Sequence, residues 1–155
     1  MEVFPVGSWN GGDESSVKIQ LAWNQEMGFW GEGPSGHRVM MDAAQEVGGS
    51  NQGARPTELL LMALGGCTGM DVLSILRKMQ VPVKDLTISV QGTQVEEHPR
   101  HFSHIQVVYE VHGVDLPYSK VKRAVELSQE KYCPVAHTLA GRVKIDYQVK
   151  LVEAS

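Results

Sequence analysis

The sequence contains two cysteines, Cys67 and Cys133, and no other residue types in it are better suited to redox chemistry. Two cysteines are too few to form a disulfide framework in a chain of 155 residues. If the two thiols meet in the folded chain, we expect them to serve redox chemistry or metal binding rather than to hold the fold together. An inert buried thiol is the alternative for each.

Cys67 lies within a predicted helix and has three glycines close to it, Gly65, Gly66 and Gly69. A glycine inside a helix costs about 1 kcal/mol relative to alanine, so the glycines need a compensating role. Two roles remain open at this point. The glycines either allow another segment to pack closely against the helix, or leave room for a substrate above the sulfur of Cys67.

Cys133 follows a second predicted helix and directly precedes Pro134. The C-terminus of a helix disfavours a thiolate, so Cys133 suits a resolving thiol, which attacks a sulfur that is already oxidised. Cys67, Cys133 and His137 would offer three zinc ligands, but a fourth is missing and Pro134 disturbs the i, i+4 geometry. Three other histidines flank a predicted turn and are not expected to share a site: His98, His101 and His104. The sequence therefore predicts no metal and no cofactor.

The composition indicates one globular domain spanning residues 1–155, with 42% hydrophobic residues and a net charge of −4. A nucleic-acid-binding protein would normally have a basic surplus, so no nucleic-acid partner is expected. The longest strongly apolar run, Leu59 to Leu64, is far shorter than the roughly 20 residues that span a bilayer. The acidic, glycine-rich N-terminal segment does not resemble a signal or transit peptide. We therefore expect a cytoplasmic protein without a membrane partner.

The elements that must position the cysteines follow from hydrophobic periodicity and from proline and glycine punctuation. The pattern predicts an α+β fold on antiparallel sheet, in the order βββ-α-ββ-α-β. The expected strands cover residues 17–23, 27–30, 37–41, 86–96, 102–111 and 142–151, and the expected helices cover residues 56–79 and 118–132.

The first predicted helix is apolar on nearly every side between Leu59 and Leu64. A helix that is apolar all round is buried all round, and one small sheet cannot cover it. The sequence therefore predicts that a second copy of the chain covers the rest.

Two segments resemble the OsmC/Ohr superfamily of osmotically inducible and organic-hydroperoxide-resistance proteins. The segment from Asn51 to Cys67, with Arg-Pro-Thr-Glu-Leu at its centre, resembles the first-cysteine motif of that family. The segment from Lys131 to Val135 resembles the second-cysteine motif. The spacing of the cysteines and the element order over about residues 15–152 agree with the resemblance.

The resemblance implies an intertwined homodimer in which antiparallel sheets wrap around long central helices. It also implies a thiol-dependent peroxidase that acts on small organic hydroperoxides. Cys67 would be the peroxidatic cysteine and Cys133 the resolving cysteine, and an external dithiol would reduce the resulting disulfide. The alternative is a protein without enzymatic activity that binds a small hydrophobic ligand or senses redox state through a weakly reactive pair.

A reactive thiolate needs a nearby cation, which in the founding members is an arginine held by a glutamate. This chain has Thr57 at the position of that glutamate, and Glu58 lies on the opposite helix face from the cysteine, roughly 13.5 Å along the axis. Arg55, just before the helix, is therefore the expected cation, and Arg38 is its rival. Asp71, four positions after Cys67, counts against a reactive Cys67, because a carboxylate disfavours a neighbouring thiolate.

Overall fold

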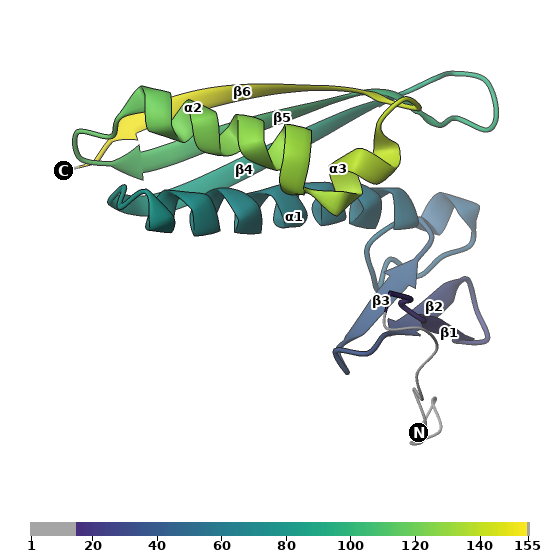
Figure 1. The fold of residues 1–155 in the computed structure, drawn as a ribbon. Coiled ribbons are helices and arrows are strands. Elements are labelled where there is room, and N and C mark those ends of the chain that lie inside the picture. Colours follow the sequence, from purple (N-terminus) through teal and green to yellow (C-terminus); the bar gives the residue numbers. More distant parts are fainter. Residues whose placement is uncertain (1–14, 155) are drawn as a thin grey trace. The chain divides into compact units, whose positions relative to one another are not determined.

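The structure is a computed structural model that describes residues 15–154 (Figure 1). The N-terminal segment, for which no signal or transit peptide is expected, lies outside the described residues apart from its last positions. The chain forms two compact units, the first ending at Leu59 and the second beginning at Leu60.

The first unit contains a small antiparallel sheet. Its strands are β1 (Gln20–Trp23), β2 (Gly28–Glu32) and β3 (Arg38–Asp42), with β2 in the centre. The three predicted strands are thus confirmed. The ladder begins at Gln20, so β1 is shorter than the alternation from Val17 suggests. A short 3-10 turn, η1 (Gln45–Val47), follows the sheet.

The loop after β3 is fastened by one carboxylate, that of Asp42. It accepts backbone N–H groups from Ala43 at 2.8 Å, Ser50 at 3.2 Å and Gln52 at 3.1 Å. The hydrogen bond from Gln52 is the main cause that lowers the pKa of this carboxyl. The loop that leads to the long helix is therefore held by charge-assisted hydrogen bonds.

The long predicted helix is confirmed as α1 (Pro56–Lys78). Its start has half of a capping box, because the Glu58 carboxylate accepts the backbone N–H of Arg55 at 2.9 Å. Its last turn carries Arg77 and Lys78, whose charges suit the negative end of the helix dipole.

By length and composition α1 is able to cross a membrane, which the short apolar run in the sequence did not indicate. The core helix of a soluble protein passes the same test. Leu64, Val72 and Leu76 of α1 are no more than 1% exposed, within the core of the second unit.

The second unit is built on a sheet of three long strands, β4 (Val83–Gln94), β5 (Phe102–Gly113) and β6 (Lys144–Glu153), with β5 in the centre. β4 and β5 form the predicted antiparallel hairpin. β6, however, runs parallel to β5, so the expectation of a purely antiparallel sheet was wrong for this pair. The helical segment between the two strands is a crossover connection, and such a connection returns the chain in the same direction.

That crossover consists of three helical pieces. α2 (Tyr118–Leu127) continues into a π-helical turn, η2 (Ser128–Tyr132), and α3 (Pro134–Leu139) follows. The predicted helix over 118–132 is confirmed in extent. The sequence did not predict α3. A proline ends a preceding helix, but Pro134 also occupies the first turn of the next one.

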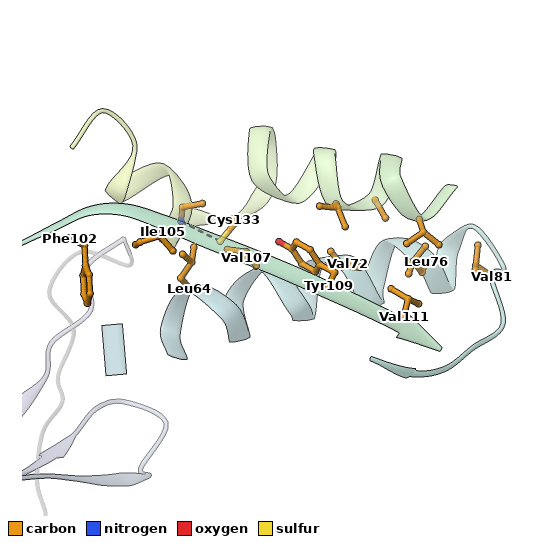
Figure 2. Packing of buried hydrophobic residues seen from close by; sticks show 14 residues of the cluster. Leu64, Val72, Leu76, Val81, Phe102, Ile105, Val107, Tyr109, Val111 and Cys133 are labelled. Carbon is orange, nitrogen blue, oxygen red and sulfur yellow. Dashed lines mark hydrogen bonds between the residues drawn. The ribbon is translucent and has the colours of Figure 1, made fainter. Parts of the chain in front are cut away.

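One face of the sheet carries the core of the second unit (Figure 2). The register places Ile88, Tyr109 and Val149 next to one another across the three strands. The fully buried apolar side chains on the opposing helices include Leu64, Val72 and Leu76 on α1 and Val121, Ala124 and Val125 on α2.

The three glycines around Cys67 differ in how closely other side chains approach them. A Cβ at Gly65 would lie 2.9 Å from a methyl of Val90, and one at Gly69 would lie 2.7 Å from the terminal methyl of Ile88. A Cβ at Gly66 would meet nothing within 4 Å. Two glycines therefore allow α1 to pack closely against β4, whereas Gly66 faces open space in the single chain.

This difference predicts opposite effects of one substitution at neighbouring positions. Where Gly66 is uncovered, as in the single chain, Gly66→Ala should raise the free energy of unfolding by about 0.5–1 kcal/mol, because alanine favours the helix. Gly65→Ala should be about 1–2 kcal/mol less stable than Gly66→Ala, because the branched Val90 side chain has to move. Urea unfolding of both variants measures the difference. A destabilised Gly66→Ala would indicate that another surface covers Gly66, such as the second copy of the chain expected on α1. Equal stability of the two variants would contradict the expectation.

Candidate functional site

Three side chains with transferable protons meet in the second unit. The sulfurs of Cys67 and Cys133 and a carboxylate oxygen of Asp71 all lie within 4.8 Å of one another. Cys67 and Asp71 are four residues apart on α1, which places them on one helix face. Cys133 comes from the start of α3. The structure therefore brings the two predicted cysteines together, 66 positions apart in the sequence.

The two cysteines differ in exposure. Cys133 is completely buried, whereas Cys67 is partly exposed. An accessible thiol beside a buried thiol is the arrangement expected of a pair in which Cys67 meets an external reactant and Cys133 reacts only with Cys67.

Cys133 is the N-cap residue of α3, and its sulfur accepts the backbone N–H of Ala136 at 3.3 Å (Figure 2). A helix N-terminus favours a thiolate, which is the reverse of the effect expected from a position after a helix. Burial nevertheless dominates and raises the pKa of the Cys133 thiol to about 11, with a further increase from its hydrogen bond with Cys67. Cys133 is therefore a neutral thiol at rest, as predicted, but for a different physical reason.

Asp71 accepts a hydrogen bond at 3.0 Å from the hydroxyl of Ser128, in η2. Ser128 and Thr68 are joined at 2.8 Å, and Thr68 and Tyr109 at 2.6 Å. The amide of Gln129 donates to the Tyr109 hydroxyl at 2.6 Å. Thr68, Tyr109 and Ser128 are all fully buried.

The two ends of this chain fix its direction. The Gln129 nitrogen only donates, and the Asp71 carboxylate only accepts. Each hydroxyl has one proton, so Tyr109 donates to Thr68, Thr68 to Ser128 and Ser128 to Asp71. Burial also raises the pKa of Tyr109, which keeps its donor proton in place. We call this hydrogen-bonded series, Gln129–Tyr109–Thr68–Ser128–Asp71, the donor chain.

Sequence reasoning identified Asp71 only as an unfavourable neighbour of Cys67 and gave no role to Thr68 or Tyr109. Ser128 lies where the apolar stripe of the second predicted helix ends. The π-helical turn gave no recognisable sequence signal, although it places Ser128 and Gln129 toward α1. A polar pair at the end of an apolar helix stripe is the one available hint.

His137 does not join the cysteines. Its Nε2 is hydrogen-bonded to the backbone oxygen of Glu130 at 2.8 Å, and the third group beside the two sulfurs is Asp71. The zinc ligand set considered from the sequence is therefore not assembled.

Arg55, the predicted cation, belongs to the first unit. Its guanidinium donates to the Gly53 oxygen at 3.0 Å and to the Asn51 side-chain oxygen at 2.8 Å. Its rival Arg38 forms an ion pair with Glu32 at 3.4 Å. The role of Arg55 toward Cys67 remains a prediction.

Fold and site together define a class of protein: an α+β chain in which a long core helix presents one cysteine to a second, buried cysteine. Residues 49–148 match the family model described as OsmC-like protein. The chain therefore belongs to the OsmC-like family, as its two cysteine motifs predict.

Individual proteins similar to this chain agree with the assignment to this family. Protein YhfA of Escherichia coli K12 is 38% identical over 138 residues, which cover 89% of this chain and all of YhfA. A hypothetical protein from Aquifex aeolicus has a TM-score of 0.79 at 28% identity, over 90% of this chain and 98% of that one. An organic hydroperoxide resistance protein OsmC from Legionella pneumophila has a TM-score of 0.65 at 14% identity, over 90% and 99%. The last similarity concerns the fold alone.

The unequal thiols predict strongly unequal alkylation. At pH 8 a thiol with a pKa of about 11 is only ~0.1% ionised, and Cys133 is also buried. Iodoacetamide should therefore modify Cys67 at least about tenfold faster than Cys133 in the reduced native protein. Peptide mass spectrometry of timed samples measures both rates, and the same reaction in urea is the control, in which the two rates should converge. Faster modification of Cys133 in the native protein would contradict this assignment.

Proposed function

We propose that the protein is a thiol-dependent peroxidase that reduces small organic hydroperoxides through Cys67 and Cys133. The observation that carries the proposal is the pairing of an accessible and a buried sulfur within 4.8 Å. A peroxidatic thiol must meet the substrate, and a resolving thiol must reach the oxidised sulfur without a large rearrangement.

The proposed cycle has three steps. The Cys67 thiolate attacks the distal oxygen of the hydroperoxide, which breaks the O–O bond and gives a sulfenic acid and, after protonation, an alcohol. The Cys133 thiol then condenses with the sulfenic acid, forming a disulfide and water. An external dithiol reduces the disulfide by two exchange steps and is itself oxidised to a disulfide.

The family supports this chemistry, since the Legionella structure is described as an organic hydroperoxide resistance protein. We also propose a homodimer, because Leu60, Met62 and Met70 on α1 are 40%, 59% and 74% exposed in the single chain. The cytoplasm is the proposed location, since a reducing compartment supplies the dithiol.

A peroxide reaction followed by peptide mapping tests the cycle. With one equivalent of cumene hydroperoxide, the wild-type protein should form a Cys67–Cys133 disulfide. Cys67→Ser should leave the hydroperoxide unconsumed. Cys133→Ser should consume one equivalent and accumulate a sulfenic acid that dimedone traps. Unmodified cysteines in the wild-type protein after this treatment would refute the peroxidase.

A second test concerns the cation. One adjacent arginine can lower a thiol pKa by about 1–3 units. Arg55→Ala should therefore reduce peroxidase activity by roughly ten- to a thousandfold, with sedimentation and thermal unfolding unchanged. Arg38→Ala is the matched control and should have a smaller effect. Full activity of Arg55→Ala combined with loss in Arg38→Ala would assign the cation to Arg38 instead.

A second candidate function is binding of a small hydrophobic ligand without turnover. The observation that favours it is a surface hollow beside Asp71, whose apolar lining includes Ile75, Met79 and Leu127. Binding of this kind does not require a thiol, so it should survive in Cys67→Ser, whereas peroxidase activity should not.

A further inference from the structure

We propose that Asp71 is the base that accepts the proton of Cys133 when Cys133 attacks the oxidised sulfur of Cys67. The inference rests on the proposed two-cysteine cycle and adds a third reacting group to it. It also reverses the role that the sequence suggests for Asp71, because the carboxylate serves the second step rather than hindering the first.

The second step needs a base. The nucleophile in disulfide formation is a thiolate, yet burial holds the pKa of Cys133 near 11, so only about one molecule in 10⁴ has that thiolate at pH 7. A base beside the sulfur removes the proton as the S–S bond forms. The Asp71 carboxylate lies within 4.8 Å of both sulfurs and is therefore placed to do so.

The donor chain prepares Asp71 to act as an acceptor. All three of its hydroxyls point their protons toward the carboxylate, starting from the Gln129 amide. Successive hydrogen bonds that run in one direction polarise one another. The buried polar groups thus hold the Asp71 side chain beside the two sulfurs.

Asp71 also has a route to solvent, because it lines the same surface hollow as Ser74 and Lys78. A proton taken from Cys133 can therefore leave without crossing the core. Several titratable or charged side chains lie beside Asp71, line the same hollow or connect to it through hydrogen bonds. They are Cys67 and Lys78 on α1, Tyr132 in η2, Cys133 before α3 and, through the donor chain, Tyr109 on β5.

The step balances as follows. The Cys133 sulfur forms the S–S bond and is oxidised, while the S–O bond of the Cys67 sulfenic acid breaks and that sulfur is reduced. Asp71 takes the proton of Cys133, and the departing hydroxide leaves as water with a proton returned by the Asp71 carboxyl. When an external dithiol later attacks the disulfide at Cys67, the Asp71 carboxylate can take the proton of the attacking thiol and pass it to the departing Cys133 sulfur.

The base can be tested without any hydroperoxide, using 5,5′-dithiobis(2-nitrobenzoate), DTNB. The accessible Cys67 should react first and form a mixed disulfide, releasing one equivalent of the coloured thiolate. Cys133 should then attack the Cys67 sulfur and release a second equivalent. The aromatic thiolate departs without taking up a proton. The second phase therefore involves one proton transfer, the loss of the Cys133 proton.

Asp71→Asn should slow the second phase about 10- to 100-fold at pH 7. Asparagine can still accept the hydrogen bond from Ser128, so the fold should persist, and thermal unfolding checks this. Asp85→Asn, at an exposed position on β4, is the matched control and should leave both phases unchanged. An unchanged second phase in Asp71→Asn would overturn the proposal.

The pH profile gives a second readout that a merely structural role would not change. With a carboxylate base, the second phase in the wild-type protein should vary little between pH 6 and 9, a range between ordinary carboxyl titration and the pKa of Cys133, about 11. In Asp71→Asn the rate should rise about tenfold per pH unit, because only the free thiolate reacts. A wild-type rate with that same steep rise would overturn the proposal without recourse to a variant.

The experiments can distinguish failure of Asp71 as a base from failure of the proposed peroxidase. If hydroperoxides leave the cysteines unmodified but the second DTNB phase depends on Asp71, the peroxidase fails and the base stands. If hydroperoxides drive the disulfide but Asp71→Asn behaves as wild type in both readouts, the peroxidase stands and the base fails. Release of a single equivalent by the wild-type protein would show that Cys133 does not attack Cys67, which also overturns the base.

Discussion

The donor chain is the interaction on which the second unit depends. It begins at Gln129 and ends on Asp71, and on the way it joins η2, β5 and α1 through hydroxyls at 2.6, 2.8 and 3.0 Å. Because Thr68, Tyr109 and Ser128 are completely buried, an unpaired hydroxyl among them would cost about 1–3 kcal/mol. The chain is satisfied only if α1, the sheet and the π-helical turn are correctly aligned.

This alignment also positions the thiols. The π-helical turn that places Ser128 against Thr68 is followed directly by Cys133, so the partner of Asp71 and the buried sulfur come from one short segment. Pro134 then starts α3, whose first turn supplies the N–H that the Cys133 sulfur accepts. Packing, polar satisfaction and site geometry are therefore consequences of the same few residues.

Burial and local dipoles compete at Cys133, and burial prevails. The N-terminus of α3 favours a thiolate, yet the missing solvent raises the pKa of the thiol to about 11. A buried thiol of this kind is protected from external oxidants and reacts through its neighbour. The proposed role of Asp71, to accept the proton of this thiol, connects the polar core of the unit to its proposed chemistry.

The sequence alone determined the element order, the extent of α1, the β4–β5 hairpin and the two cysteine motifs. These follow from local rules: hydrophobic period, prolines at helix starts, and turn residues between alternating strands. The cysteine motifs also sufficed to indicate the OsmC-like family, to which the chain belongs. Only the tertiary structure decided the parallel pairing of β6 with β5, the π-helical turn before Cys133 and the position of Asp71 beside the two sulfurs. Each of these depends on contacts between residues more than 30 positions apart, or on a helix irregularity without a sequence signal. The type of Asp71 was visible in the sequence, but its function depends on the hydroxyls that point toward it, and those come from three different elements.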